Sequence, residues 1–323
     1  MKLQGALALP FRGGFVRLER MAPAARSAAR QSGKENAVLI ASRDNRWLKR
    51  FRSALAGEHG DDGIVGVEGF RFVEAALGSG QPVEALLVSE SGARHLPRVS
   101  HLLDAAVPVL RTSDKLFAGV ADTRTPQGIA ALVRLRRATI ENLMAGTALL
   151  AVLVGVQDPG NVGTIVRAAE AFGATGVATC PAGGIGTADP FGPKALRASA
   201  GSALRLPIVL GISPTILLAQ LQMSRVKIYA AVAEESKNSS AGGDLSFFPP
   251  WEIDWKTQAA ILIGNEGAGL PAELVRAADA RVYIPQAAAT APIGIESLNA
   301  AMAASVLLYE AMRQRNAARQ QKS

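Results

Sequence analysis

A five-residue apolar run, residues 259–263, ends in a loop, residues 264–269, that contains three glycines. Such a run is typical of a strand buried on both faces of a sheet. Pro271 follows the loop and suits the first turn of a helix, where its missing N–H costs no hydrogen bond. Glycines let the backbone approach a ligand closely, and α/β sheets bind ligands at the carboxyl ends of their strands. We therefore expect Asn265 and Glu266 to face a bound molecule.

Further apolar runs alternate with helical segments through the carboxyl-terminal half of the chain. Strands are predicted at residues 149–154, 176–179, 227–232, 259–263 and 281–284, and helices at 163–172, 214–223, 271–278 and 297–315. Parallel strands need a crossover connection, which is usually a helix. Residues 148–316 are therefore predicted to form an α/β domain with a mostly parallel sheet flanked by helices.

The amino-terminal half repeats this alternation on a smaller scale. Residues 36–134 are predicted to form a small α/β domain, with strands at 64–67, 83–88, 107–110 and 127–133 and a helix at 69–77. Ser42 is the predicted cap of an earlier, basic helix. Residues 135–147 are the predicted linker, and residues 317–323 a short tail. Residues 1–35 are predicted to be a disordered basic tail, with an RNA-contacting arm or a transit peptide as the alternatives.

The basic composition of the chain indicates which kinds of molecule it can bind. The 323 residues carry a formal net charge of +8 and a sequence pI of about 10.0, which favours nucleic acid first and an anionic membrane second. No apolar run reaches the ~20 residues of a membrane helix. The single cysteine, Cys180, excludes an internal disulfide framework and fits a reducing compartment. With three scattered histidines, a His/Cys metal site is not expected.

A second polar segment, residues 157–170, follows a buried strand and enters a helix. Its Asn161 can bond backbone or ligand, and Arg167 shares a helix face with Gly163 and Glu170. The guanidinium is suited to holding phosphate, whereas the alternative is a surface ion pair with Glu170. The segment lacks the G-x-G-x-x-G spacing, which argues against a dinucleotide site.

A third segment, residues 292–299, leads into a long helix. Ser297 is its predicted cap, which puts Asn299 in the first turn. The positive end of a helix suits a carboxylate or another polar ligand, and ordinary capping is the alternative. The helix body is rich in alanine, which allows close packing in a core or a dimer interface.

The three segments occur in one order, and together they resemble the motifs of the SpoU (TrmH-like) family of RNA ribose 2′-O-methyltransferases. The first motif is Asn161, Gly163 and Arg167, the second is residues 263–271, and the third is Ser297-Leu298-Asn299 with Tyr309 and Glu310. The stretch from Lys194 to Pro207 matches the family between the first two motifs. The amino-terminal unit, with Ser42, Asn45, residues 67–69 and residues 126–128, is similar to the family's small substrate-binding domain. The resemblance covers most of residues 38–315.

The resemblance implies a carboxyl-terminal trefoil-knotted (SPOUT-type) sheet, with S-adenosylmethionine bound in the knot and a homodimer formed through the knotted domain. It also implies a small amino-terminal α/β domain of the ribosomal L30e-like type that binds the RNA substrate. The expected substrate is structured RNA, with ribosomal RNA favoured over transfer RNA. The protein is expected to be cytoplasmic, to bind no metal ion and to associate with no membrane.

Residue roles follow from the same resemblance. The predicted catalytic residues are Arg167, Asn161, Glu266, Ser297 and Asn299. The predicted cofactor-binding residues are Ile263, Gly264, Asn265, Gly267, Gly269, Leu270, Ile284, Pro285, Ile293 and Leu298. The predicted RNA-binding residues are Arg43, Arg46, Lys49, Arg50 and Arg197.

Two questions stay open at this point. The family assigns Arg167 the role of a base, but guanidinium groups keep their proton in proteins, so a clamp on the neighbouring phosphate is the alternative. A non-catalytic RNA-binding protein that retains the cofactor pocket is the alternative function. The chain also departs from the family in a long segment at residues 286–296 and in Ala300, where valine is usual.

Overall fold

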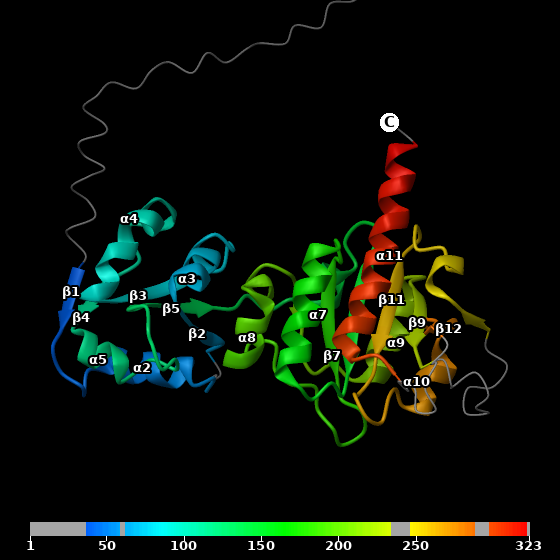
Figure 1. The fold of residues 1–323 in the computed structure, drawn as a ribbon, viewed down its shortest axis with the longest axis horizontal. Helices are drawn as coiled ribbons and strands as arrows, with labels where there is room; N and C mark the ends of the chain where they lie inside the picture. Colours follow the sequence, from blue (N-terminus) through cyan, green and yellow to red (C-terminus); the bar gives the residue numbers. More distant parts are fainter. Residues whose placement is uncertain (1–36, 59–61, 234–245, 288–296, 322–323) are drawn as a thin grey trace, which may run out of the picture.

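The structure, a computed structural model, describes residues 37–58, 62–233, 246–287 and 297–321. Two sheets lie next to each other along the long axis, and helices cover both faces of each (Figure 1). The smaller sheet is built from residues 37–134 and the larger one from residues 149–282. The α/β class predicted for both halves of the chain is confirmed.

The smaller sheet has the strand order β1-β4-β3-β5-β2. Strands β1, β4 and β3 are parallel, whereas β5 runs antiparallel to β3 and β2. The strands are β1 (Ala37–Ile40), β2 (Ile64–Glu68), β3 (Val83–Ser89), β4 (Val109–Thr112) and β5 (Ile129–Arg134). The helices are α2 (Arg46–Leu55), α3 (Phe70–Leu77), α4 (Leu96–Val99) and α5 (Asp114–Ala118), with 3-10 turns η2 (Ser91–His95) and η3 (Ser100–Leu102).

The basic helix α2 is capped differently from the prediction. Asn45, not Ser42, precedes its first residue, and the Asn45 side-chain oxygen accepts from the Trp47 N–H at 2.9 Å. The Ser42 hydroxyl instead accepts from the Asp44 N–H at 3.2 Å, and both residues come before the first residue of the helix, Arg46. The prediction was wrong because both residue types make good caps, and only the start of the helix decides between them.

The larger sheet is entirely parallel, in the order β10-β12-β9-β11-β6-β7-β8. Its strands are β6 (Leu149–Val154), β7 (Gly176–Cys180), β8 (Ile208–Val209), β9 (Lys227–Ala231), β10 (Phe247–Phe248), β11 (Ala259–Ile263) and β12 (Ala280–Val282). The helices are α6 (Ile140–Leu143), α7 (Pro159–Ala171), α8 (Pro193–Ser199), α9 (Pro214–Met223), α10 (Ala272–Ala277) and α11 (Ala300–Gln320), with 3-10 turns η4 (Ser202–Leu204) and η7 (Pro250–Glu252). The predicted bounds of β6, β11 and α9 match the structure.

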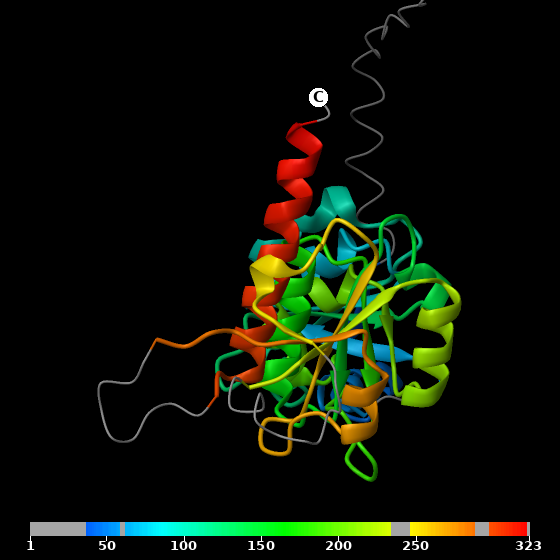
Figure 2. The same ribbon diagram turned by 90° about the vertical axis from the view of Figure 1, so that its right-hand side faces the viewer.

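Two apolar layers hold the larger sheet. Helices α7 and α11 pack on one face, and α9 and α10 lie on the other (Figure 2). Both faces of β6 and β11 are therefore buried, which explains why these strands are continuous apolar runs. The predicted linker, residues 135–147, is partly packed as well, because α6 buries Ile140 and Leu143 under the second layer.

The two sheets pack against each other through apolar contacts and hydrogen bonds. The first apolar layer runs from Val65 and Val67 in β2 to Leu149 in β6. The Gln81 side chain accepts from the Arg136 N–H at 2.9 Å and donates to the Leu204 carbonyl at 3.2 Å. These contacts hold the smaller sheet against the larger one.

Cys180 is buried at the end of β7, and its burial raises the pKa of the thiol to about 12. Within the described ranges, no three or more His, Cys, Asp or Glu side chains are grouped so that they could hold a metal ion. No helix in the described part of the chain has the length and apolar character needed to cross a membrane.

Candidate active site

Three loops meet at the carboxyl edge of the larger sheet. Strands β6 and β11 are neighbours, so the segment that enters α7 at Pro159 lies next to the glycine loop, residues 264–269, that follows β11. The short segment before α11, from Ser297 to Asn299, lies at the same place. All three segments singled out in the sequence are therefore brought together.

A chain of side-chain hydrogen bonds joins the three loops. The Glu266 carboxylate accepts from the Asn161 side-chain amide at 2.9 Å and from the N–H groups of Gln157 and Asp158 at 3.2 and 3.3 Å. The Asn161 side-chain oxygen in turn accepts from the Asn299 amide at 3.0 Å. Asn161 is thus held at both ends of its side chain, with Glu266 on one side and Asn299 on the other.

Asn299, not Ser297, caps α11. Its side-chain oxygen accepts from the N–H groups of Ala301 and Met302 at 2.9 and 3.3 Å. The prediction that Ser297 caps this helix was wrong, because the helix begins only at Ala300. Ser297 is therefore free of a capping role and lines a cavity instead.

Asn265 stabilises the glycine loop from within. Its side-chain oxygen accepts from the N–H groups of Gly267 and Ala268, and its amide donates to the Gly155 carbonyl at 2.8 Å. Its backbone pairs with Gly269 in both directions. The polar side-chain atoms of Asn265 are bonded within the protein, although the residue lines the cavity, so its contact with a ligand stays a prediction.

The charge state of Glu266 follows from these contacts. Partial burial pulls the pKa of its carboxyl upward, but the bonds from Asn161 and the backbone N–H groups outweigh this effect. The pKa of Glu266 therefore lies below its ordinary value, and the carboxylate is ionised at neutral pH.

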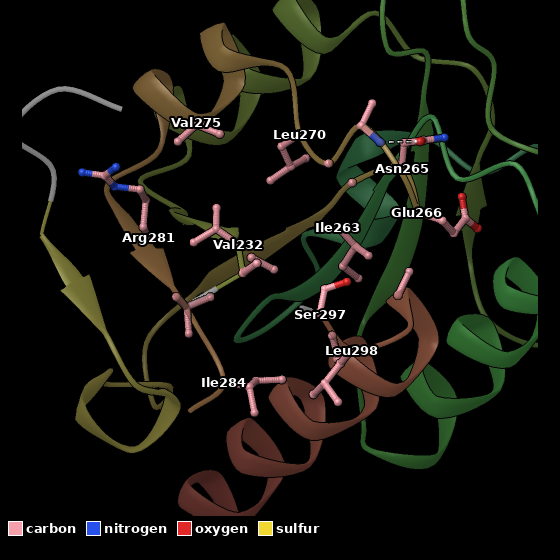
Figure 3. Close-up of a pocket in the computed structure, with 18 of the residues that line it drawn as sticks. Val232, Ile263, Asn265, Glu266, Leu270, Val275, Arg281, Ile284, Ser297 and Leu298 are labelled. Carbon is pink, nitrogen blue, oxygen red and sulfur yellow. Dashed lines mark hydrogen bonds between the residues drawn. The ribbon is translucent and has the colours of Figure 1, made fainter. Parts of the chain in front are cut away.

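A cavity of about 390 Å³ opens between the glycine loop, β12 and the start of α11. Apolar side chains, among them Val232, Ile263, Leu270, Ile284 and Leu298, surround it, and Glu266 lies at its edge (Figure 3). Its volume is in the range of small-molecule sites, which are apolar with a few polar groups. Its polar lining includes the Ser297 hydroxyl, Gln286, the loop backbone and Arg281, whose buried guanidinium lies 3.9 Å from the Phe247 ring centre.

Most of the predicted cofactor residues line this cavity. These are Ile263, Gly264, Asn265, Gly267, Gly269, Leu270, Ile284 and Leu298. Pro285 lies between two lining residues, Ile284 and Gln286, but does not itself line the cavity. Ile293 lies outside the described residues. The sequence reasoning missed residues at and after the end of β9 and several others. They are Ala231, Val232, Ala233, Ala268, Ala272, Val275, Arg281, Val282, Gln286, Ala300, Ala303 and Leu307. Apart from Arg281 and Gln286 these residues are apolar, and apolar residues carry no local signal of ligand contact.

Arg167 is placed apart from the cavity. It is exposed on α7 and does not line the cavity of its own chain. The alternative ion pair with Glu170 does not form, because Glu170 binds Arg205 through two bonds of 2.6 and 2.7 Å. Among the described residues, no hydrogen bond or ion pair engages the Arg167 guanidinium.

The predicted RNA-binding residues differ in how freely they face solvent. Arg43 and Arg46 are exposed, and Lys49 is 3.8 Å from Asp44. Arg50 is bound to Glu84 and Asp62 at 2.9 and 3.2 Å. Arg197 forms an ion pair with Asp122 between the two sheets.

Comparison with known proteins gives the family. The model of the SpoU rRNA Methylase family matches residues 148–309, and that of the MRM3-like substrate binding domain matches residues 61–131. The chain is 32% identical to the 23S rRNA (guanosine(2553)-2′-O)-methyltransferase RlmP of Bacillus subtilis, over 75% of this chain and 86% of that protein. The chain belongs to the SpoU rRNA methylase family.

Two further similarities bear on the activity of this SpoU protein. It is 32% identical to the 23S rRNA (uridine(2479)-2′-O)-methyltransferase of Streptomyces viridochromogenes, over 77% of this chain and 82% of that protein. The AdoMet-bound rRNA methyltransferase of Sinorhizobium meliloti superposes with a TM-score of 0.69 at 27% identity, over 86% of this chain and 98% of that one. The chain is an RNA 2′-O-methyltransferase that uses S-adenosylmethionine.

The glycine loop of this SpoU protein gives a matched pair of variants. A methyl group added at Gly264 would lie 2.4 Å from the Gly269 carbonyl carbon, whereas one added at Gly267 would have no atom closer than 3.7 Å. We expect Gly264→Ala to lower the midpoint of thermal unfolding by several degrees, in line with overpacking costs of about 1–3 kcal/mol, and to weaken cofactor binding. Gly267→Ala should leave the midpoint unchanged. Calorimetry of both variants checks this, and equal midpoints would contradict it.

Proposed function

We propose that this SpoU methyltransferase transfers the methyl group of S-adenosylmethionine to a ribose 2′-hydroxyl of structured ribosomal RNA. The observation that carries the proposal is the Glu266–Asn161–Asn299 hydrogen-bond chain, which joins the three loops beside the cavity. The relatives named above act on 23S rRNA, and the basic charge of this chain fits a polyanionic substrate.

The cavity residues fit the cofactor by chemistry. The apolar side chains of Ile263, Leu270 and Leu298 suit the adenine ring, and the exposed backbone of the glycine loop offers hydrogen bonds to its edge. Pro285 and Ile293 stay predictions as further contacts. The cofactor supplies an electrophilic methyl group on a sulfonium, which is a good leaving group.

The protein's task is then to position the hydroxyl and accept its proton. Ser297 lines the cavity at the start of α11, where its hydroxyl can orient the ribose. Asn161 and Asn299 hold one another, so we assign both to positioning the loops rather than to contact with RNA. Glu266 stays ionised and holds Asn161 and the start of α7.

Arg167 is proposed to act at the cavity of a partner subunit in a homodimer. Its exposed place on α7, outside the cavity of its own chain, supports this. Helix α11 packs along α7 and exposes Met302, Val306 and Tyr309, which are 59%, 42% and 50% exposed. An apolar face of this kind fits a dimer interface. Arg167 would clamp the phosphate beside the target ribose, a task for which a planar guanidinium is well suited.

The finer features of the fold belong to the same proposal. A trefoil knot at the cavity is supported by the hydrogen bond between Asn299, which comes after β12 in the sequence, and Asn161 at the start of α7. An L30e-like RNA-binding domain is supported for residues 36–134 by the matched substrate-binding model. Residues 148–316 would form the knotted catalytic domain, and the reduced, buried Cys180 fits a cytoplasmic protein.

Helix α2 is proposed as a phosphate-contacting surface of the amino-terminal domain. Replacing the exposed Arg46 with alanine is expected to weaken RNA binding and to reduce the slope of log affinity against log salt by about 0.7–0.9, the value for one phosphate contact. Arg50→Ala is the matched comparison: Arg50 is also predicted to bind RNA, but because it binds Glu84 and Asp62 we expect its loss to change this slope less than the loss of Arg46. Filter binding at several salt concentrations measures both, and equal slopes in Arg46→Ala and wild type would exclude this surface.

The function is tested with RNA from cells that lack the gene. The purified protein and labelled S-adenosylmethionine should methylate ribose in ribosomal RNA and leave transfer RNA unlabelled. Methylation of transfer RNA alone would overturn the choice of target. Cofactor binding with no transfer to any RNA would favour the non-catalytic alternative.

A further inference from the structure

A short hairpin projects from the carboxyl end of β7 beside the catalytic loops. Ala182 and Ile185 exchange two backbone hydrogen bonds of 2.8 and 3.0 Å, so that Gly183 and Gly184 form its tip. Ile185 is 38% exposed. The loop that follows β7 lies beyond the lower end of the larger sheet in Figure 1.

The base of the hairpin is tied to the active site. The Thr187 hydroxyl accepts from the Gly155 N–H at 2.9 Å and donates to the Cys180 carbonyl at 2.7 Å. The Gly155 carbonyl in turn accepts from the Asn265 side chain in the glycine loop at 2.8 Å. Gly155 therefore connects the hairpin to the glycine loop that borders the cofactor cavity. Hydrogen bonds through Gly155 fix the position of the hairpin relative to that loop.

Two glycines of this segment, Gly184 and Gly186, are not required by the structure of the chain itself. A methyl group added at Gly183, Gly184 or Gly186 would have no atom within 4 Å, and only Gly183 has a left-handed φ, of +57°. Packing and backbone conformation therefore do not require glycine at positions 184 and 186. Among the described residues, no hydrogen bond engages the N–H groups of these three glycines. Glycine permits the close approach of an external ligand to the backbone.

We propose that the hairpin, residues 182–186, is a substrate-contacting element that sets the affinity for RNA. The RNA backbone lies against Gly184 and Gly186, whose N–H groups donate to phosphate oxygens, and a nucleobase next to the target ribose packs on Ile185. This inference rests on the proposed function, because the hairpin borders the edge of the sheet at which the RNA must enter. It adds an RNA contact that lies outside the three motifs and the amino-terminal domain.

The test uses the full chain with three variants, Ile185→Ala, Gly184→Ala and Gly186→Ala. Each should retain the wild-type unfolding midpoint and the wild-type affinity for S-adenosylmethionine. Ile185→Ala should raise the KM for ribosomal RNA by about tenfold, the order expected when a base loses its contact surface. The glycine variants should raise this KM as well, because the added methyl group keeps the phosphates away from the backbone N–H groups. In all three variants kcat at saturating RNA should equal that of the wild type. Met223→Ala is the matched control for Ile185, because Met223 is an 85% exposed apolar residue on α9.

A wild-type KM in all three variants would overturn the proposal. So would a lowered unfolding midpoint or weakened cofactor binding in the glycine variants, since either result would mean that the glycines serve the protein's own structure. Retention of ribosomal RNA on filters without cofactor tests the hairpin separately from catalysis. A wild-type protein that retains RNA but transfers no methyl would contradict the proposed function, and the retention of the variants would still decide for or against the hairpin.

Discussion

Arg167→Ala is expected to abolish methyl transfer while leaving the affinity for S-adenosylmethionine unchanged. The side chain lies outside the cavity of its own chain, so its removal should not disturb the cofactor contacts. We expect the Arg167 side chain to act on the RNA substrate instead. Loss of a group that positions or deprotonates the reacting hydroxyl lowers the rate of methyl transfer by about 10²–10⁴-fold. Single-turnover methyl transfer and calorimetry with the cofactor measure the two effects.

Two further variants sharpen this result. Arg167→Lys keeps the charge but loses the planar, two-pronged donor, so a phosphate clamp predicts partial recovery together with a raised KM for RNA. Lys256→Ala removes the same charge just before the amino end of β11, opposite the catalytic loops, and should leave turnover unchanged. Near-wild-type turnover in Arg167→Ala would exclude a catalytic role for this residue.

Asn161→Asp is expected to weaken cofactor binding by about 10–100-fold, since a hydrogen bond to a charged group is worth about 1.5–3 kcal/mol. The substitution removes the amide that donates to Glu266 at 2.9 Å and places a second carboxylate there. The glycine loop and the start of α7 should then separate. Calorimetry with S-adenosylmethionine measures the loss, and Gln222→Glu, which adds the same charge on the exposed side of α9, is the control.

The pH dependence of this variant has a definite sign. In the wild-type protein the pKa of Glu266 is lowered below 4.5, so its contribution is present above that value and is lost only as the pH falls through the lowered pKa. In Asn161→Asp the two carboxylates disfavour each other's charge, which raises the pKa of the pair. Cofactor affinity of the variant should therefore recover partly between neutral pH and about pH 5, whereas that of the wild type stays flat. A variant that binds the cofactor as well as the wild type at neutral pH would show that Asn161 does not join the loops in solution.

The strands of the larger sheet were predictable because their signal is local. Strands β6 and β11 are buried on both faces, so their residues must be continuously apolar, and the predicted bounds agree with the structure. Strand β1 was missed because it is an edge strand of four residues whose Val38 and Leu39 are exposed. Helix α8 has seven residues, too few for a clear helical period.

The active site, like the fold, has parts that the sequence predicted and parts that it missed. Glycines after a buried strand marked the loop at 264–269, and the order of three such segments marked the family. The cap of α11 was misassigned because Ser297 and Asn299 are both suitable residues, and only the first turn of the folded helix distinguishes them. The alanines that line the cavity were missed because they look like any other core residue.

By itself, the sequence determined the α/β class, a mostly parallel larger sheet, and the three loops at its carboxyl edge, since apolar runs and turn residues act over a few positions. Only the tertiary structure decided how those loops are joined. Asn161 bonds to Glu266 across 105 residues and to Asn299 across 138, and Arg167 lies away from the cavity on an exposed helix face. Hydrogen bonds between distant segments leave no local pattern, because an asparagine is also a good cap or turn residue and a glutamate is also an ordinary surface residue.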